Sequence, residues 1–357
     1  MKLNKLYICG ASHSGKSLVW ELIDPNPNVI VVPHHNFGLS HIYNDFLSKI
    51  TASQNVYNKR LLNANYKKKY VLNIKSSDKL INHIHIGDLL QYLISNNPCF
   101  RDIFTAHYSK HPFMHVSTGT YRLDLSFDVF MTEFEKLILK YGVDDLTIEQ
   151  IDNMIYLSYI KSINKSKSFN ATNDYFVLAG NNSIKQITTL FKYYNNFKIV
   201  VIERDFITNL YAISRHKINP LKIDLENEND MVYEQMLKML NKLKVERFNY
   251  FNIIENYLKF EDKIIKIKFE DLKLKSSLTM NKIYQFLNLI PHDGLISPLS
   301  GVRMGVASVE KDPYDIYDKS QISYLNRMLN SQTRIQIPAR NKFYHFFKKS
   351  IRKFFKN

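Results

Sequence analysis

A glycine-rich segment near the start of the chain carries the residue types that bind phosphate. Residues 10–17 read GASHSGKS, which satisfies the spacing G-x-x-x-x-G-K-[S/T]. Glycines let backbone N–H groups converge on phosphate oxygens, and a helix that begins at such a loop adds a favourable dipole. Lys16 supplies a point charge and Ser17 a hydroxyl group. We therefore expect a phosphate-binding loop here, but the loop alone does not identify the phosphate compound.

A second group of charged residues follows an apolar run much later in the chain. Residues 198–202 read KIVVI and are followed by Glu203 and Arg204. An arginine at the end of a strand, before a helix that bears serine, is typical of an anion site. Two anion sites at two strand ends suit a ligand that is phosphorylated at both ends. Glu203 at the same strand end would instead suit the Mg²⁺ site of a nucleotide hydrolase or kinase.

These motifs need a sheet that positions them, and the sequence predicts one. Short apolar runs rich in β-branched residues are each followed by helical patterns; they lie at residues 6–9, 29–32, 175–178, 198–202 and 264–269. Continuous rather than alternating runs are typical of strands covered on both faces. The fold class that this predicts is α/β, with a parallel, doubly wound sheet.

Residues 40–170 fit this pattern less well. They are rich in Asn, Lys, Tyr and Ile, have helical periodicity at residues 128–141, and contain no clear buried strand. We expect a mostly helical insertion that carries acceptor contacts. Residues 231–258 contain neither Gly nor Pro and have apolar residues at helical spacing, so they predict one long helix.

The motifs, in this order, resemble those of the sulfotransferases that use 3′-phosphoadenosine 5′-phosphosulfate (PAPS). A third motif supports the resemblance: residues 267–272, IKFEDL, resemble the family's strand that ends in Tyr-Glu-Asp-Leu, and a helix ending in a Phe-Leu pair follows. The resemblance covers about residues 3–35 and 175–305. It implies a single sulfotransferase-like α/β domain over residues 1–335, with a loop like that of P-loop NTPases.

The resemblance also implies roles for individual residues. In this family the first loop grips the 5′-phosphosulfate, and an arginine, a serine and a late basic loop hold the 3′-phosphate. The matching donor-binding residues are His13, Ser14, Gly15, Lys16, Ser17, Arg204, Ser214 and Arg303. Lys16 would also stabilise the charge that builds on the leaving phosphate, so that no metal is required.

The chain departs from the family pattern at two places. Lys16 and Ser17 replace a pair of threonines, which makes the loop similar to that of a nucleotide kinase. A P-loop kinase or nucleotidase that uses ATP and Mg²⁺ therefore remains an alternative. Ser214 lies two residues after the family's serine position, which falls on Ala212, and two residues correspond to about 200° of rotation on a helix.

A general base must accept the proton of the acceptor hydroxyl or amine. Branches of the family place a catalytic glutamate just after the second strand, and that position falls on His34 here, beside His35. An unperturbed histidine has a pKa of about 6.5, which suits a base at neutral pH. We expect His34 or His35 to be the base, and the sequence does not choose between them.

The positive charge is concentrated rather than spread. The 357 residues carry a net charge of +16, of which residues 59–79 contribute +6 and residues 340–357 contribute +7. The tail, residues 336–357, places phenylalanines on one helical face and lysines and arginines on the other. This pattern predicts an interfacial helix on anionic lipid, the alternative being a helix packed on the protein's own core. No nucleic-acid partner is expected.

Location and substrate follow as expectations. No apolar stretch is long enough for a secretory signal or a membrane span, and the only cysteines are Cys9 and Cys99. We expect a cytoplasmic enzyme, peripheral at the inner membrane face. Its acceptor would be a carbohydrate or glycolipid, because the tail would bring it to lipid-linked substrates. A non-enzymatic, membrane-associated nucleotide-binding module is the remaining alternative.

Overall fold

The structure is a computed structural model, and it describes part of the chain. The described residues are 2–11, 14–23, 25–35, 71–75, 80–85, 127–142, 146–162, 170, 173–179, 183–218, 227–291, 302–303, 306–307 and 312–330. The chain divides into two compact units, each of which is described by itself. The first is Met1–Asp205 with Tyr250–Val309, and the second is Phe206–Asn249 with Glu310–Asn357. The predicted tail, residues 336–357, lies outside the described residues.

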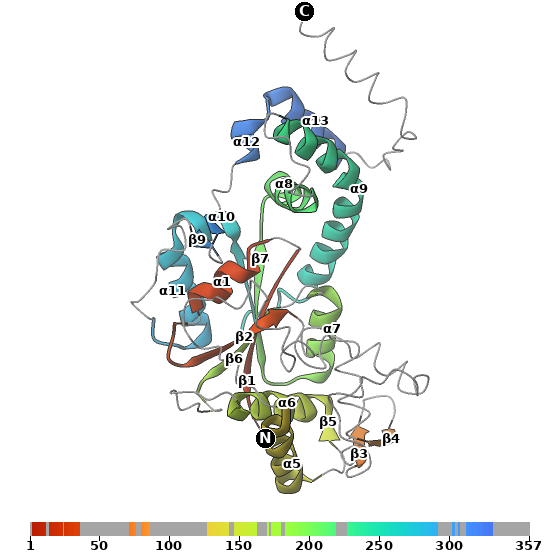
Figure 1. The fold of residues 1–357 in the computed structure, drawn as a ribbon, viewed down its shortest axis with the longest axis vertical. Helices are drawn as coiled ribbons and strands as arrows, with labels where there is room; N and C mark the ends of the chain where they lie inside the picture. The colour runs from red at the N-terminus through yellow and green to blue at the C-terminus, as the bar shows by residue number, and fades with distance from the viewer. Residues whose placement is uncertain are drawn as a thin grey trace, which may run out of the picture. The chain divides into compact units, whose positions relative to one another are not determined.

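The first unit is built on a parallel sheet of five strands, in the order β2-β6-β1-β7-β8 (Figure 1). The strands are β1 (Asn4–Gly10), β2 (Val29–His35), β6 (Tyr175–Ala179), β7 (Phe197–Glu203) and β8 (Ile264–Lys268). Each coincides with one of the predicted apolar runs, so the predicted parallel sheet is confirmed. The last run was predicted one residue too long, because Phe269 is the first residue of helix α10 (Phe269–Leu274).

Both faces of this sheet are buried, which is why its strands are apolar throughout. Leu6 and Ile8 of β1 belong to a cluster with helices α1 (Lys16–Ile23) and α11 (Ser276–Leu287). The intervening Tyr7 and Cys9 are equally buried. Figure 1 shows α1 and α11 on one side of the sheet and α7 (Ser183–Tyr193) on the other. The cluster includes Trp20 of α1, which is only 3% exposed.

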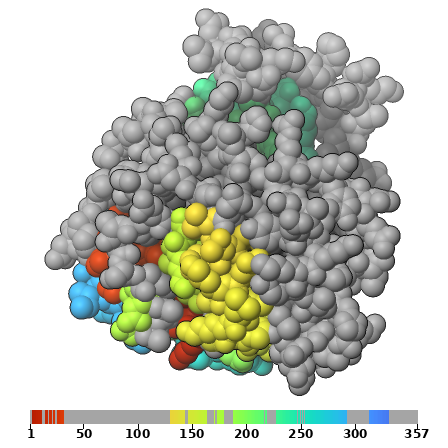
Figure 2. Space-filling model, turned by 60° about the horizontal axis from the view of Figure 1, so that its bottom comes forward, coloured from red at the N-terminus to blue at the C-terminus, as the bar shows by residue number. Residues whose placement is uncertain are grey.

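The insertion between β2 and β6 differs from the expectation. Its described part contains two helices, α5 (Phe127–Tyr141) and α6 (Ile148–Ser162), which pack together and form the yellow surface in Figure 2. It also contains a small sheet in the order β4-β3-β5, made of Leu80–His85, Val71–Lys75 and Leu146–Thr147. The sequence did not predict this small sheet. Asn interrupts β3, and Asn and His interrupt β4, so these two strands lack the continuous apolar run of a buried strand.

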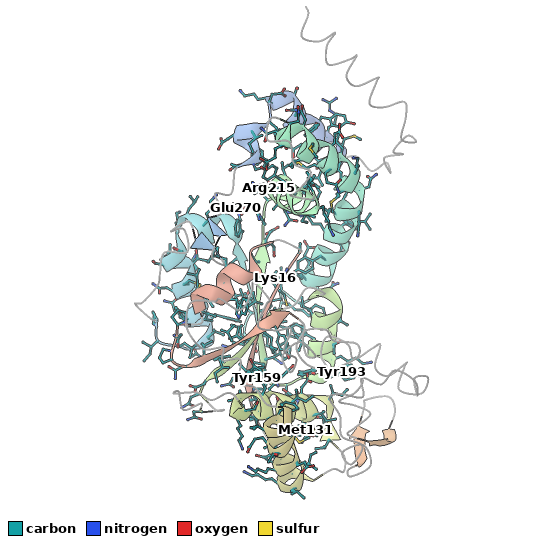
Figure 3. The ribbon with its side chains drawn as sticks, viewed as in Figure 1. Lys16, Met131, Tyr159, Tyr193, Arg215 and Glu270 are labelled. Carbon is teal, nitrogen blue, oxygen red and sulfur yellow. The ribbon has the colours of Figure 1, made fainter. Side chains whose placement is uncertain are left out.

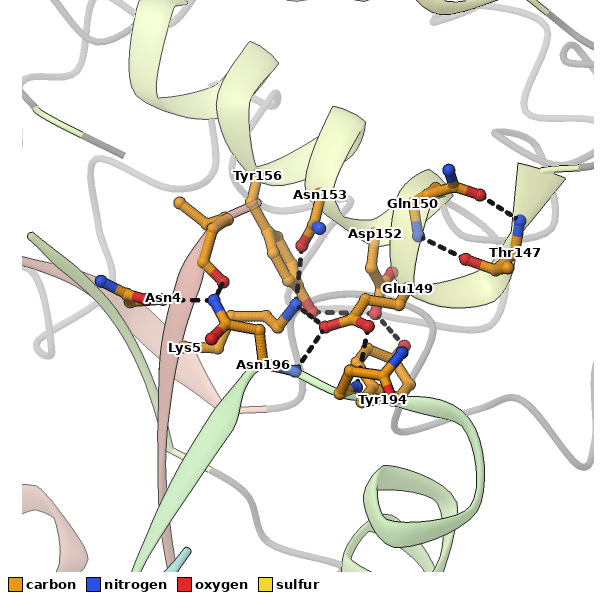
Figure 4. A network of polar contacts seen from close by, with 12 residues as sticks. Asn4, Lys5, Thr147, Glu149, Gln150, Asp152, Asn153, Tyr156, Tyr194 and Asn196 are labelled. Carbon is orange, nitrogen blue, oxygen red and sulfur yellow. Dashed lines mark hydrogen bonds and ion pairs between the residues drawn. The ribbon is translucent and has the colours of Figure 1, made fainter. Parts of the chain in front are cut away.

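A buried polar network joins α6 to the amino end of β1 (Figure 4). The Lys5 ammonium donates hydrogen bonds to Glu149 Oε1 and Asn153 Oδ1, both at 2.7 Å. The Glu149 carboxylate also accepts the backbone N–H groups of Asn195 (2.8 Å) and Asn196 (3.0 Å). Every charge in this group therefore has an oppositely charged or hydrogen-bonding partner, as burial requires.

A second buried carboxylate lies one helical turn further along α6. Asp152 is fully buried and accepts hydrogen bonds from the hydroxyl groups of Tyr156 and Tyr194. Burial raises the pKa of both tyrosines well above the usual value, and the nearby Asp152 charge adds to this effect. The two hydroxyl groups therefore remain protonated donors. They connect α6 to Tyr194, which directly follows α7.

The second unit is helical. It contains α8 (Phe206–Lys217), α12 (Pro313–Ile316), α13 (Lys319–Asn330) and the greater part of α9 (Glu228–Glu255). Its core joins apolar residues of α8, α9 and α13, including Leu210, Met236 and Leu325. The predicted long helix is thus confirmed, although it ends at Glu255. Over the residues that the structure describes, no helix has both the length and the apolar character of a membrane span.

Candidate phosphate-binding site

The predicted phosphate loop follows β1, which ends at Gly10, and leads into α1, which begins at Lys16. Gly15 has a φ of +97°, and a Cβ atom there would lie 2.2 Å from Cδ2 of Phe269. A Cβ on Gly10 would lie 2.8 Å from the carbonyl oxygen of Ile202. Both glycines are therefore required by close approach of neighbouring strands and helices, and the loop lies tightly against β7 and α10.

Lys16 is buried at the base of this loop. Its ammonium donates hydrogen bonds to the carbonyl oxygens of Gly10 (3.1 Å) and Ala11 (2.6 Å), and the residue is 4% exposed. Burial lowers the pKa of the Lys16 ammonium to about 8. The side chain is therefore mostly protonated at neutral pH. It is available to an anion that competes with these two carbonyl groups.

Of the two predicted serines of the loop, the structure describes the side chain of Ser14 only. Ser14 is 1% exposed, and its Oγ makes no hydrogen bond with any described residue. A buried hydroxyl that bonds to none of the described residues is a candidate partner for a ligand oxygen. Ser17 lies in the first turn of α1, but its side chain is outside the description. His13 lies outside the described residues altogether.

Arg204 follows β7, the strand next to β1 in the sheet. It is 5% exposed, and its guanidinium carbon lies 4.4 Å from the centre of the Phe269 ring. The next residue, Asp205, donates its backbone N–H to the Glu270 carboxylate (2.9 Å). Figure 3 labels Lys16 and Glu270 on this unit. The carboxyl ends of β1, β7 and β8 therefore bring together the phosphate loop, Arg204 and the start of α10.

Glu203, the candidate magnesium ligand, has a different partner. Its carboxylate forms an ion pair with Lys266 of β8 at 2.8 Å. A carboxylate that neutralises a neighbouring lysine is less available for a divalent cation. Within the described ranges, no three His, Cys, Asp or Glu side chains form a cluster suited to a metal ion.

The remaining predicted residues are placed only in part. Ser214 lies on α8 in the second unit, fully buried, and its Oγ has no hydrogen-bond partner among the described residues. Arg303 lies in β9 (Val302–Arg303), which pairs antiparallel with β10 (Val306–Ala307). His34 and His35 end β2, the edge strand beside β6. The structure does not describe the side chains of Arg303 and the two histidines.

Sequence reasoning missed two residues of the site, Phe269 and Glu270. Both were part of the IKFEDL motif, but only the motif's resemblance to a family was used. One signal was present: acidic residues 270 and 271 directly after a strand favour the start of a helix, because they lie near its positive end. The contact between Phe269 and Gly15, 254 positions apart, has no local signal in the sequence.

Comparisons with known proteins give the following matches. No family model and no curated protein sequence matches the chain. The sulfotransferase domain from the curacin biosynthetic pathway is similar in structure with a TM-score of 0.39 and 12% identity, over 98% of this chain and 99% of that one. A sulfotransferase from Alicyclobacillus acidocaldarius gives 0.40 and 9%, over 92% of both chains. One from Mycobacterium tuberculosis gives 0.37 and 11%, over 92% of this chain and 77% of the other.

All three of these solved structures are sulfotransferases, the class of enzyme that the motifs resemble. Their TM-scores and identities are too low for any of them to carry an argument about fold, activity or substrate. The function is therefore inferred from the residues and contacts of the chain itself.

Proposed function

We propose that the protein is a sulfotransferase that transfers a sulfuryl group from PAPS to a hydroxyl or amine of an acceptor. One observation carries the proposal: a phosphate loop and a buried arginine lie at the carboxyl ends of the neighbouring strands β1 and β7. In open α/β sheets, ligands bind at this edge. Two anion-binding groups on adjacent strands suit adenosine phosphorylated at both its 3′ and 5′ positions.

The residues of the loop have distinct roles in this reaction. The acceptor oxygen or nitrogen forms a bond to sulfur, and the bond between sulfur and the bridging oxygen of the 5′-phosphate breaks. Charge then grows on the leaving phosphate, where Lys16, the loop N–H groups and the Ser14 hydroxyl would stabilise it. His13 and Ser17 complete this loop. Arg204 and Arg303 would hold the 3′-phosphate, and a role for Ser214 stays the prediction that the family resemblance made. No metal takes part in the proposed step.

His34 or His35 is proposed as the base that takes the acceptor proton. Both lie at the end of β2, at the carboxyl edge of the same sheet. Replacing the true base with Ala should lower turnover at saturating acceptor without weakening the binding of adenosine 3′,5′-bisphosphate. If neither single substitution lowers turnover, the assignment of the base fails.

The proposed acceptor is a carbohydrate or glycolipid, and the proposed location is cytoplasmic, at the inner face of the membrane. Residues 340–357 supply the reason, since their pattern suits an anionic lipid surface. A panel of free sugars, soluble glycans and glycolipids in detergent, each with PAPS, tests this by release of the bisphosphate. Turnover with none of the sugar-bearing acceptors would contradict the acceptor class.

Calorimetry tests the donor. Adenosine 3′,5′-bisphosphate should bind without Mg²⁺, and Arg204→Ala should weaken it by about tenfold or more, because a charge-assisted contact is lost. Arg327→Ala is the matched control: it removes an exposed arginine of α13 and should leave affinity unchanged.

The kinase alternative predicts the opposite pattern. The Gly-Lys-Ser sequence at residues 15–17 favours it, as in nucleotide kinases. Binding of ATP that requires Mg²⁺ and is indifferent to Arg204→Ala would replace the sulfotransferase proposal with this one. The ion pair between Glu203 and Lys266 counts against that outcome.

A further inference from the structure

The corner between β8 and α10 contacts both halves of the proposed donor site. Strand β8 pairs in parallel with β7 up to the pair Lys268 and Glu203. The residues that directly follow the two strands, Phe269 after β8 and Arg204 after β7, therefore lie side by side. The proposed reaction assigns no role to this corner. Its first two side chains nevertheless make contacts in the proposed site: Phe269 contacts Gly15 and Arg204, and Glu270 accepts the N–H of Asp205.

Phe269 lies between the phosphate loop and Arg204. One edge of its ring approaches Gly15 so closely that a Cβ there would lie 2.2 Å from Cδ2 and 2.5 Å from Cε2. The Arg204 guanidinium stacks over the ring, with 4.4 Å between the guanidinium carbon and the ring centre. Phe269 itself is 4% exposed and belongs to the main hydrophobic cluster. A rigid ring held on three sides fixes the separation of the two groups that it contacts.

Glu270 restrains the same region from the neighbouring position. Its carboxylate accepts the N–H of Asp205, the residue after Arg204. A hydrogen bond from a backbone N–H to an ionised acceptor is stronger than one between neutral groups. It holds the backbone between β7 and α8, and with it the stem of the arginine.

We infer that Phe269 is a positioning residue that sets the spacing between the two anion-binding groups, with Glu270 as its partner. The inference rests on the proposed function, because it concerns a ligand with two phosphate groups. Neither residue needs to touch the ligand. The benefit of binding two groups at once depends on whether their spacing matches that of the ligand. Phe269 therefore affects a ligand that uses both sites, and not a ligand that uses one.

Three ligands separate this role from a general loss of structure. Calorimetry should compare adenosine 3′,5′-bisphosphate with adenosine 5′-phosphate and adenosine 3′-phosphate. In Phe269→Leu, the affinity for the bisphosphate should fall by about tenfold, because a shift of one anion-binding group by an ångström or less has a cost of this size. The affinity for either monophosphate should change by less than about twofold. Phe269→Tyr keeps the ring and should restore the affinity for the bisphosphate.

Phe286→Leu is the matched control for Phe269→Leu. This ring packs against the same hydrophobic cluster and also lies under a cation, with Lys198 Nζ 4.6 Å from its centre. It lies on α11, and its loss should leave the ratio of bisphosphate to monophosphate affinity unchanged. Glu270→Ala tests the inference without removing a core ring and should lower the same ratio. Glu270→Gln retains an acceptor oxygen and should lower it less.

The outcomes separate the inference from the function that it assumes. The positioning role is overturned if Phe269→Leu lowers the affinity for all three ligands equally, or if it leaves the affinity for the bisphosphate unchanged. If Phe269→Leu does not fold, an unchanged ratio in Glu270→Ala overturns it instead. If the wild-type protein binds the bisphosphate no more tightly than the monophosphates, the proposed function itself fails.

Discussion

At the scale of single residues, Lys16 shows how the proposed site is arranged when no anion is bound. Its ammonium is held by two backbone carbonyl groups of its own loop, Gly10 and Ala11. An ionised phosphate binds the ammonium more strongly than these neutral carbonyl groups do, because two full opposite charges also attract each other. A phosphate that enters the loop can therefore take over the ammonium without a change of fold.

The affinity for the bisphosphate should fall as the pH rises above neutrality. The pKa of Lys16 is lowered to about 8, so its charged fraction decreases through this range. Only the charged form attracts the phosphate, and from pH 7 to pH 9 that form decreases by about tenfold, with the affinity following it. Calorimetry at the two pH values measures this. In Lys16→Met the affinity should be lower and vary little over the same range; an equally steep decrease in that variant would assign the pH dependence to another group.

Gly15→Ala should be far more damaging than Gly142→Ala. Both glycines have positive φ, +97° and +80°, so both substitutions incur a backbone cost of about 1–2 kcal/mol. A Cβ on Gly142 has no atom of the described residues within 4 Å, whereas one on Gly15 overlaps the Phe269 ring. Overpacking should add about 1–3 kcal/mol and impair bisphosphate binding. Denaturant unfolding compares the two; equal losses of stability would mean that the ring moves aside freely.

The sequence predicts the residues of the loop better than their surroundings. Spacing and residue type are local properties, so residues 10–17 predict a phosphate loop, and β1 and α1 flank this segment as expected. The contacts of Phe269 with Gly15 and Arg204 come from strand order, which joins residues that are far apart in the chain. Residue type alone does not predict such a contact.

At the scale of elements, the five strands of the main sheet were predictable because burial on both faces leaves a continuous apolar run. The small sheet of the insertion was not. Its strands β3 and β5 pair although they are about seventy residues apart, with Ile74 opposite Leu146. Short strands of mixed polarity do not indicate such a partner. The helical spacing at residues 128–141 predicted α5 to within one residue, whereas no pattern was recognised for α6.

The docking of α6 on β1 should depend on Lys5. In Lys5→Met, the Glu149 carboxylate loses its buried countercharge and keeps only the two backbone N–H groups. Removing one partner of a buried pair costs about 3 kcal/mol or more. Denaturant unfolding should show this loss. The bisphosphate affinity should remain, since Lys5 lies at the amino end of β1 and the phosphate loop follows its carboxyl end.

Lys136→Met provides the control for this prediction. Lys136 pairs with Glu133 on α5, but its side chain is 61% exposed. Exposed pairs contribute less than about 1 kcal/mol, so this variant should be close to the wild type in stability. Equal effects of the two substitutions would contradict a special role for the buried pair.

At the scale of the whole molecule, charge distribution is the property most open to test. Residues 340–357 carry +7 of the net +16, and they lie outside the described residues. We expect their deletion to abolish sedimentation with vesicles that contain phosphatidylserine, because each basic residue near such a surface contributes about 1 kcal/mol. Bisphosphate affinity should be unchanged in the shortened protein.

Two comparisons make the tail experiment specific. Neutral phosphatidylcholine vesicles should retain little of the full-length protein, and high salt should release it from the anionic ones, because salt screens surface charge. If the shortened protein associates with anionic vesicles as strongly as the full-length protein, residues other than 340–357 bind the membrane. Residues 59–79, which carry +6, would then be the next segment to delete.

The position of Trp20 gives the protein a reporter of its own. It is the single tryptophan among 357 residues, and it is buried on α1, the helix that begins at Lys16. Excitation at the red edge of protein absorbance selects this indole over the 23 tyrosines. All of the resulting emission therefore originates one helical turn from the phosphate loop. Trp20 fluorescence can therefore report the binding of adenosine 3′,5′-bisphosphate or ATP to unlabelled protein. The signal comes from α1, the helix whose amino end would bind the phosphate.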